Sequence, residues 1–403
     1  MGTAVGTAVG TAVGIAVGEQ SSEPNVSGPG TQGGPSLGST GILPCQAIAA
    51  LWRDGEIAAA QPLLDGQVQP SSLDLRLGEV AYRVRASFLP GTGTDMAKKI
   101  EQFTMHKVDL TEGAVLERGC VYIVPLLERL SLSQRLSAIA NPKSSTGRLD
   151  VFTRLITDGS SEFDRIDAGY HGPLYAEIAP RTFSILVRTG VRLNQMRLRR
   201  GEHRLTDGEL TRLHQQSPLV HGEAGTENIS GGIALTVDLQ GADDDGLIGY
   251  KARPHAPLID IEKIAHYDPA DFWEPIHAGT GTSSGLVLNP DDFYILASRE
   301  AVSVPPEYAA EMVAYDTLVG EFRVHYAGFF DPGFGWAAAG GEGTRAVLEV
   351  RSHDVPFLLE HGQTVGRLVY ERLTTVPDRI YGQDIGSNYQ QQSLALSKQF
   401  RRT

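Results

Sequence analysis

The stretch Asn141-Pro-Lys-Ser-Ser-Thr-Gly-Arg148, together with Arg165-Ile-Asp-Ala-Gly-Tyr-His-Gly-Pro-Leu-Tyr-Ala-Glu177, carries the strongest pattern in this sequence. Residues 143–148, which we call the cradle, combine two cations, two serine hydroxyls and a glycine, a composition suited to binding phosphate oxygens. The order Gly-Pro-Leu-Tyr-Ala-Glu in the second segment predicts a short strand, on which Tyr175 and Glu177 share a face because side chains alternate. We therefore expect an anion site with a carboxylate directed at it.

These motifs resemble those of the deoxycytidine triphosphate deaminases, a family related to the trimeric dUTPases. The family's basic-Ser-Ser-x-x-Arg cradle reads here Lys143-Ser144-Ser145-x-x-Arg148. Its Ile-Asp-x-Gly-aromatic-x-Gly turn matches residues 166–172, and its strand ending in Leu-Glu matches Ala176-Glu177. Residues 69–78 are similar to the family's Gln-Pro-x-Ser-x-Asp-x-Arg-Leu-Gly opening, and Tyr381 with 388–392 resembles its C-terminal lid. The resemblance covers most of residues 41–392.

The resemblance implies hydrolytic deamination of dCTP to dUTP and ammonia, which supplies pyrimidine deoxynucleotides for dTMP synthesis. It assigns catalysis to Glu177 as general acid and base, with Ser144 and Arg148 holding phosphates or the reacting water. It implies substrate-binding roles for Lys143 and Ser145 at the phosphates, Asp167 at the sugar, Tyr175 and Ala176 at the base through backbone groups, and Tyr381, Asn388 and Gln392 closing over the triphosphate. Magnesium is expected to arrive with the triphosphate rather than in a protein cage.

The chemistry of this reaction requires a nucleophilic water, a proton for the ring and release of ammonia. A buried glutamate can take the proton from water and pass it to a ring nitrogen. Zinc deaminases activate water with a metal held in a His-x-Glu and Pro-Cys-x-x-Cys signature, which this sequence lacks. The resemblance instead implies a glutamate mechanism with no catalytic zinc and no metal ligands in the protein.

Two alternatives stay open. The first is a dUTPase or a bifunctional deaminase that continues to dUMP, for which Asp167 would activate water at phosphorus. The second is a barrel that binds nucleotides without turning them over. The chain departs from the family pattern in having Lys143 where arginine is usual, Asn388 where the tail has a lysine, and extra residues between Arg148 and Asp167.

Composition places the chain among globular proteins, with 41% hydrophobic and 21% charged residues. A formal net charge of −13 argues against general nucleic-acid binding, so a local cluster must meet an anionic substrate. The two cysteines, Cys45 and Cys120, make no disulfide framework or zinc spacing, which favours a reduced, cytoplasmic setting without a membrane partner.

The sequence predicts a tandem repeat of one barrel. Residues 1–40, rich in Gly-Thr-Ala-Val repeats and then Ser, Pro and Gly, are expected to be disordered. Segments of the second half are similar in sequence to segments of the first: 286–296 to the strand around Val121, 330–335 to 166–170, and 346–350 to 175–178. We expect a barrel carrying the catalytic motifs at 41–205, a linker at 206–230, and a second, degenerate barrel with the lid-like tail at 231–403.

Glycine-punctuated segments such as 114–124 and 182–196 predict short strands, and a helical pattern runs from Ile42 to Gly55. Another short helix is expected near 209–216, and the run 197–204 reads most simply as a solvated loop. Joined to the resemblance, this pattern predicts a mainly β protein of two tandem dUTPase-like distorted β-barrels with a few short helices.

The two copies are not equivalent. Where the first has the cradle, the second has Tyr315-Asp-Thr-Leu-Val-Gly-Glu321, which should repel a triphosphate. Glu349 matches Glu177 in position but lacks a Lys-Ser-Ser-x-x-Arg partner to present a substrate. We therefore expect Glu349→Gln to leave the reaction rate unchanged. Because the lid-like tail follows only the second copy, one site can be built from both halves. The family's three-fold ring of barrels implies a homotrimer or a multiple of it.

Overall fold

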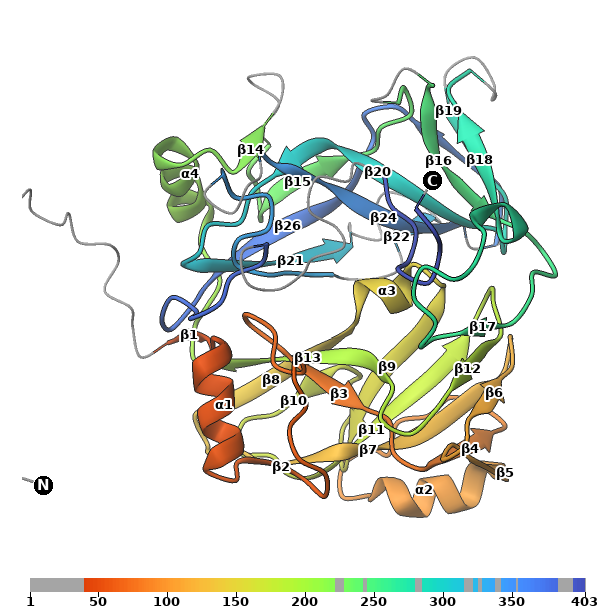
Figure 1. Ribbon diagram of the computed structural model, residues 1–403. Coiled ribbons are helices and arrows are strands. Elements are labelled where there is room, and N and C mark those ends of the chain that lie inside the picture. The colour runs from red at the N-terminus through yellow and green to blue at the C-terminus, as the bar shows by residue number, and fades with distance from the viewer. Residues whose placement is uncertain are drawn as a thin grey trace, which may run out of the picture. The chain divides into compact units, whose positions relative to one another are not determined.

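Two halves of the chain repeat one arrangement of strands, the first in red to yellow-green and the second in green to blue (Figure 1). The computed structural model describes residues 40–221, 228–241, 245–279, 285–314, 322–324, 328–337, 342–352, 354–382 and 394–402. Asn388, Gln392, Glu321 and nearly all of the segment predicted to be disordered lie outside the described residues.

The first half is built around a sheet of order β5-β4-β7-β11-β9, with β2 also paired to β7. A second sheet has the order β1-β13-β8-β10, with β3 paired to β13, and β6 and β12 form a smaller sheet. The strands are β1 (Gly41–Ile42), β2 (Ile57–Ala59), β3 (Leu73–Arg76), β4 (Val80–Val84), β5 (Thr104–Asp109), β6 (Ala114–Leu116), β7 (Val121–Ser131), β8 (Leu136–Pro142), β9 (Val151–Thr157), β10 (Arg165–Ile166), β11 (His171–Pro180), β12 (Ile185–Val187) and β13 (Arg192–Arg200).

The second half repeats this plan with a sheet of order β18-β16-β20-β24-β22, to which β14 adds, and sheets of order β15-β26-β21-β23 and β19-β25. Strand β24 thus holds the place of β11, and β20 that of β7. The strands are β14 (Val220–His221), β15 (Ile233–Thr236), β16 (Leu247–Ala252), β17 (Ile259–Asp260), β18 (Trp273–His277), β19 (Gly285–Leu288), β20 (Phe293–Val302), β21 (Tyr308–Ala314), β22 (Phe322–Val324), β23 (Phe329–Phe330), β24 (Thr344–Ser352), β25 (Phe357–Glu360) and β26 (Thr364–Arg372).

Alternation of side chains explains how these strands close around a core. In β8, Leu136, Ala138 and Ala140 point into the buried cluster of the first half, while the residues between them are less buried. A separate cluster fills the second half, with Leu296 of β20 and Leu348 of β24 at its centre. Each half therefore has its own hydrophobic core.

The described helices are short: α1 (Cys45–Arg53), α2 (Met96–Phe103), α3 (Ser144–Gly147), α4 (Asp207–Gln216) and the 3-10 turn η1 (Pro269–Asp271). The helix expected from Ile42 begins three residues later. Gly41 and Ile42 pair with Arg200 and Arg199 of β13 instead, and Pro44, which lacks an N–H, stands at the helix start. The helix expected near 209–216 is α4, which a Thr206–Glu209 capping box begins. No helix among the described residues is long and apolar enough to span a membrane.

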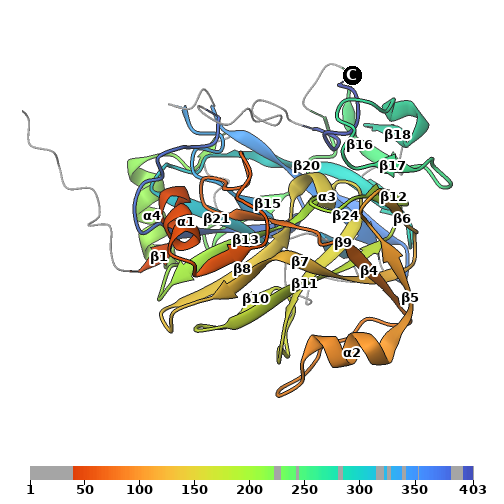
Figure 2. The ribbon, with the colours of Figure 1, turned by 60° about the horizontal axis from the view of Figure 1, so that its bottom comes forward.

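The halves are joined by more than the connection between them. Strand β17 of the second half pairs in parallel with β12, and Figures 1 and 2 both show them side by side. Phe400 near the C-terminus packs against Phe272 and Trp273 of the second half, which join the core cluster of the first half. The last described segment, 394–402, also contacts the first half directly, because Ser397 donates to the backbone oxygen of Ser145.

The expectation of a solvated loop at 197–204 is wrong for its first residues. Arg197 lies in β13, is fully buried, and donates to Glu371 of β26 at 2.8 Å and to the backbone oxygen of Ala310 at 3.1 Å. Its guanidinium also lies over the ring of Phe329. A run of arginines reads as solvated in a sequence, but here one of them joins the two halves as a buried, paired charge.

Candidate active site

The cradle forms the short helix α3 between β8 and β9, with Lys143 just before it and Arg148 just after it. Ser144 is exposed, whereas Ser145 and Arg148 are buried. The chain leaves the helix through Asp150 at a positive φ of 53°, which reverses its direction into β9. The cradle therefore presents the exposed hydroxyl of Ser144 between two basic residues, Lys143 and Arg148, in a short, sharply turning segment.

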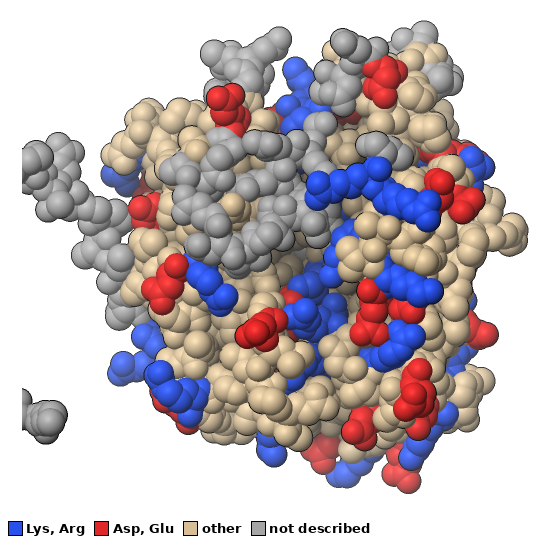
Figure 3. Space-filling view, in the orientation of Figure 1, with Lys and Arg blue, Asp and Glu red and all other residues tan. Residues whose placement is uncertain are grey.

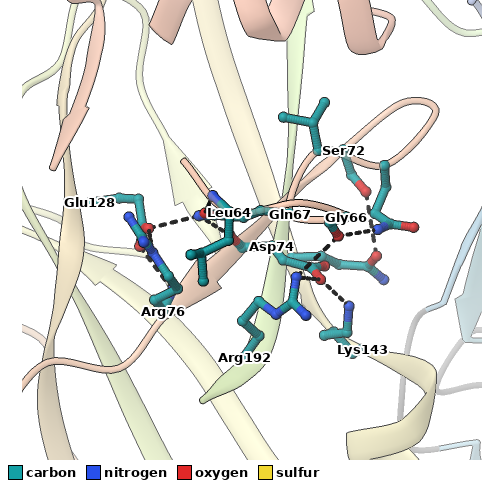
Figure 4. A network of polar contacts seen from close by, with 12 residues as sticks. Leu64, Gly66, Gln67, Ser72, Asp74, Arg76, Glu128, Lys143 and Arg192 are labelled. Carbon is teal, nitrogen blue, oxygen red and sulfur yellow. Dashed lines mark hydrogen bonds and ion pairs between the residues drawn. The ribbon is translucent and has the colours of Figure 1, made fainter. Parts of the chain in front are cut away.

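A buried carboxylate, Asp74 of β3, lies between Lys143 of the cradle and Arg192 of β13 (Figure 4). Its Oδ2 accepts a hydrogen bond from Nζ of Lys143 and lies 3.5 Å from Nη1 of Arg192 on β13. Nearby, the buried ion pair between Arg76 and Glu128, 2.7 Å long, fixes strand β3 against β7. Asp74 thus holds two cations at one place.

The C-terminal segment closes on the cradle from the second half. Nη1 of Arg148 donates to the backbone oxygen of Ala395 at 2.9 Å. The hydroxyl of Ser397 donates to the backbone oxygen of Ser145 at 2.6 Å. Figure 3 shows Lys and Arg side chains gathered near the middle of this face, between the two halves. The surroundings of the cradle are therefore made by both halves of the chain.

Glu349 of β24 faces the cradle. Arg351, which shares its face of the strand, donates to Asp150 and, at 3.0 Å, to the hydroxyl of Thr182, so this face looks toward the end of α3. Burial raises the pKa of Glu349 to about 7, and the positive charge of Arg148 opposes that rise. The positive charge of Arg148, which ends the cradle of the first half, therefore acts on the glutamate of the second half.

Glu177 of β11 lies in different surroundings. Its Oε1 accepts two hydrogen bonds from Arg154 of β9, from Nη2 at 2.5 Å and from Nε at 3.1 Å. The guanidinium of Arg154 also lies over the ring of Phe163, 3.4 Å from its centroid. Burial raises the pKa of the neighbouring Asp164 to about 7. Glu177 is thus a buried carboxylate already paired with an arginine.

Strand register separates Glu177 from the cradle of its own half. In the β9–β11 ladder Glu177 lies opposite Arg154, and Pro180 lies opposite Val151, where β9 begins. Three residues of strand span about 10 Å, and α3 lies beyond that end. The sequence brings Arg148 and Glu177 into one motif. The register places Glu177 about three residues along the strand from the end of the ladder that adjoins Arg148.

The two Ile-Asp-type turns also differ. Asp167, predicted to contact the sugar, has a side chain that is 83% exposed and lies 3.3 Å from Arg165. Its counterpart Asp331 in the second half is mostly buried, accepts a hydrogen bond from Ser71 at 2.6 Å, and has a pKa raised by burial and opposed by Arg197 and Lys143. The turn of the second half is therefore the one that approaches the cradle.

Tyr381, predicted to belong to the lid, lies beside this second turn. Its backbone N–H donates to the oxygen of Pro332 at 2.8 Å, and its ring lies 5.8 Å from that of Phe334. Tyr175 and Ala176 are buried in β11, which pairs with β7 and β9 at both positions. Burial raises the pKa of Tyr175 to about 12. Their predicted backbone contacts to the base stay predictions.

Several residues near the cradle were not singled out from the sequence. Asp74 stands within the quoted opening motif, and its acidic position there could have suggested a partner for Lys143. Arg192 and Asp331 carry no local signal for a shared site, because they approach the cradle only when β13 and the second half pack around α3. Among the described residues, no group of three or more His, Cys, Asp or Glu side chains could hold a metal ion.

Comparison with known proteins agrees with this architecture. A family model described as the 2'-deoxycytidine 5'-triphosphate deaminase N-terminal domain matches residues 39–202, and one described as the C-terminal domain matches residues 206–400. A crystal structure of 2'-deoxycytidine 5'-triphosphate deaminase from Agrobacterium tumefaciens is 58% identical, with a TM-score of 0.79, over 84% of this chain and 100% of that one.

Curated relatives match over shorter stretches. The dUMP-forming dCTP deaminase of Halobacterium salinarum is 34% identical over 120 residues, 29% of this chain and 57% of that protein. The dUMP-forming dCTP deaminase of Beutenbergia cavernae is 30% identical over 140 residues, 34% of this chain and 69% of that protein. The match thus spans little more than half the length of the first of these relatives.

The fold is that of a mainly β protein built from two dUTPase-like barrels, as predicted. The chain belongs to the 2'-deoxycytidine 5'-triphosphate deaminase family. The predicted resemblance and the predicted fold class are both confirmed.

Proposed function

We propose that the protein hydrolyses dCTP to dUTP and ammonia at a site made by the cradle of the first half and Glu349 of the second. One observation carries the proposal. A buried carboxyl group with a pKa of about 7 lies beside the positive charge of Arg148, where the C-terminal segment covers the cradle. A carboxyl with a pKa near neutrality can both accept and return a proton at physiological pH.

In the proposed reaction, the carboxylate of Glu349 takes a proton from a water molecule as the water oxygen attacks C4 of cytosine. The protonated carboxyl then delivers a proton to the ring nitrogen N3. The C4–N bond of the tetrahedral intermediate breaks with a further proton transfer, and ammonia leaves while the C4 carbonyl of uracil forms. The exposed Ser144 hydroxyl and the buried Arg148 guanidinium are the cradle groups suited to orient this water or the nearest phosphate.

Glu177 is the alternative acid and base, as its match to the family motif predicts. Its carboxylate is already paired with Arg154, and its register keeps it away from the cradle of its own half. A role for Glu177 would need a basic partner supplied by another copy of the chain. We therefore favour Glu349 and retain Glu177 as the matched comparison.

The phosphates are proposed to lie on the cations around Asp74, with magnesium carried by the triphosphate itself. Lys143 and Arg192 both lie at Asp74 and together outnumber its charge. The hydrogen bonds that the family's lid makes to substrate belong in our proposal to Tyr381, Asn388 and Gln392, the last two outside the described residues.

A second candidate function is hydrolysis that continues from dUTP to dUMP. Relatives named as dUMP-forming dCTP deaminases favour this possibility. The carboxylate available for attack at phosphorus would then be Asp331, which is buried next to the cradle, rather than the exposed Asp167. Deamination at the cytosine and hydrolysis at phosphorus would use different carboxylates of one site.

One incubation separates these outcomes. The protein is mixed with dCTP and magnesium, ammonia is measured, and the nucleotides are separated by anion exchange. Ammonia with dUTP supports the deaminase, ammonia with dUMP and pyrophosphate supports the bifunctional enzyme, and pyrophosphate from added dUTP alone supports a dUTPase. A protein that releases none of these products while still binding dCTP would be a nucleotide-binding barrel.

We further propose assembly as a homotrimer or a multiple of it. In our proposal three barrels close into a ring, as the resemblance to the family implies, and two barrels in each chain then require three chains or a multiple to satisfy closed symmetry. Light scattering at micromolar concentration should give the mass of three or six chains. A mass of one or two chains would contradict the proposal.

A further inference from the structure

Arg351 of β24 and Asp150, which follows the cradle, form a buried ion pair between the two halves of the chain. We propose that this ion pair sets the position of Arg148 relative to Glu349, so that Arg351 and Asp150 are positioning residues for the reaction. This role rests on the proposed function, because that function places catalysis between the cradle and Glu349.

Asp150 lies at the point where the chain leaves the cradle. It follows Arg148 by two residues, is 1% exposed and has a positive φ of 53°, which Asp and Asn tolerate better than most residues. Its N–H donates to the backbone oxygen of Gly147 at 2.8 Å, and its own oxygen accepts from the N–H of Arg181 at 2.9 Å. Since this turn is fixed by its own hydrogen bonds, a displacement of Asp150 would also displace Arg148.

Arg351 reaches Asp150 from the strand that carries Glu349. Its Nη2 donates to Oδ2 of Asp150 and, at 3.0 Å, to the hydroxyl of Thr182. That hydroxyl in turn donates to Oδ2 of Asp150 at 2.6 Å. The other end of the guanidinium, Nη1, donates to the backbone oxygen of Asp291 at 2.5 Å. The planar guanidinium is thus bound to the second half through one nitrogen and to the first half through the other.

The position of Glu349 is coupled to this ion pair through β24. Glu349 and Arg351 are two residues apart, so their side chains share a face of the strand and start about 7 Å apart. A contact that ties Arg351 to the end of the cradle therefore also sets the distance between Glu349 and Arg148. The pKa of Glu349 responds to both cradle groups, because Arg148 opposes its rise and Asp150 adds to it.

The matching strand of the first half has a different residue at this position. Two residues after Glu177 stands Ala179, which lies opposite Phe152 of β9. Alanine cannot form an ion pair. The arginine therefore occurs on the strand whose glutamate faces the cradle, and alanine occurs on the strand whose glutamate lies away from it.

Stability by itself is a weak reason for burying these two charges, because the cost of desolvation offsets much of their attraction. Directional hydrogen bonds between charged groups do fix one geometry. Catalysis depends strongly on such geometry, since a displacement of about 1 Å can reduce a rate roughly a hundredfold. We therefore assign the ion pair to positioning.

The test variants remove charge and keep the backbone. Asp150→Asn retains a residue type that tolerates positive φ. Arg351→Met alone would leave Asp150 as an unpaired buried charge, so the main variant combines both changes. Asp291→Asn is the matched control, because Asp291 also has a positive φ of 62°, and its carboxylate lies 3.9 Å from Arg351 on a side chain that is 85% exposed.

The first measurement is kcat/KM for ammonia release from dCTP. It should fall roughly ten- to a hundredfold in the double variant, with smaller losses in Asp150→Asn and in Arg351→Lys, which keeps the charge. Asp291→Asn should match wild type. Melting curves identify the folded variants, and wild-type rates in a folded double variant, or in both milder variants, would overturn the proposal.

A double-mutant cycle separates positioning from a general structural role. If the ion pair acts through Arg148, adding the double change to Arg148→Ala should cause little further loss of kcat/KM. A purely structural role would instead give losses that add, and such additivity would overturn the proposal.

A structural measurement makes the outcome independent of turnover. Crystal structures of wild type and the double variant should show the guanidinium of Arg148 displaced from the carboxyl group of Glu349 in the variant. An unchanged distance would overturn the proposal. A wild-type protein that releases no ammonia from dCTP would remove the proposed function, yet this distance would still decide whether the ion pair positions Arg148. Ammonia release by wild type with an unchanged distance in the variant would keep the deaminase and remove the positioning role.

Discussion

Glu177 and Glu349 stand at matching positions of a repeated strand, yet they face different chemistry. Glu177 is held by two hydrogen bonds from Arg154, whose guanidinium also lies over Phe163. Glu349 is also buried, but its neighbouring cation, Arg148, comes from the other half of the chain. Burial raises the pKa of Glu349 to about 7. Duplication therefore left two identical residues, of which one is engaged in the fold and the other is suited to proton transfer.

The difference shows how a tandem repeat can divide one site between its copies. The cradle is retained in the first half and the catalytically suited carboxyl in the second, together with the buried turn at Asp331. In the proposed site the first half supplies the cradle and the second half supplies the carboxyl group. The comparison predicts that changes on the two strands will have opposite consequences.

The largest effect should come from Glu349→Gln. This change removes proton transfer while keeping the size of the side chain, so ammonia release from dCTP should fall by roughly 10²- to 10⁴-fold. Glu177→Gln should retain most of the activity if the protein stays folded. Ammonia release measured under the same conditions decides between them, and the reverse pattern would return catalysis to the first half.

Arg148→Ala should have the next largest effect, because Arg148 is buried, lies next to Glu349 and is hydrogen-bonded to the C-terminal segment. We expect triphosphate binding to weaken by on the order of 2–5 kcal/mol. Titration with dUTP measures the loss. Arg154→Ala, the matched change beside Glu177, should leave that affinity nearly unchanged, and equal losses would mean that both glutamate regions contact the nucleotide.

Glu177→Gln should act on stability. It leaves the Arg154 guanidinium without its carboxylate, so the free energy of unfolding should decrease by about 1–3 kcal/mol. The lower part of this range is expected because the Arg154 side chain is 23% exposed and therefore partly screened by water. Urea unfolding of Glu177→Gln and wild type at pH 8 checks the value, and an unchanged midpoint would show that the ion pair contributes nothing.

The last effect concerns the pH dependence of stability. The pKa of Glu349 is raised from 4.5 to about 7 by folding, so the folded chain holds this proton more tightly than the unfolded chain does. Its contribution to stability is therefore greatest below pH 4.5 and is lost as pH rises to about 7. Glu349→Gln should consequently be more stable than wild type at pH 8 and no more stable at pH 4.5. A destabilised Glu349→Gln at pH 8 would mean that the ionised carboxylate is satisfied in the folded protein.

The sequence by itself determined the family, the mainly β class and the tandem repeat. Cradle, turn and strand motifs have fixed local spacing, and strand patterns depend on alternation between neighbouring residues, so both can be read along the chain. The position of α4 followed from local signals for the same reason. The fully buried Arg197 could not be read this way, because its partner Glu371 lies in the other half of the chain.

Only the tertiary structure decided which groups share the candidate site. Spacing in the sequence joined Arg148 to Glu177, whereas strand register sets those two apart and chain packing brings Arg148 to Glu349 and Lys143 toward Asp331. The pKa of a carboxyl group likewise depends on burial and on charges that arrive from distant segments. Two glutamates in the same local motif therefore acquire different properties, because local sequence fixes the strand and its face while the surroundings of that face come from the rest of the molecule.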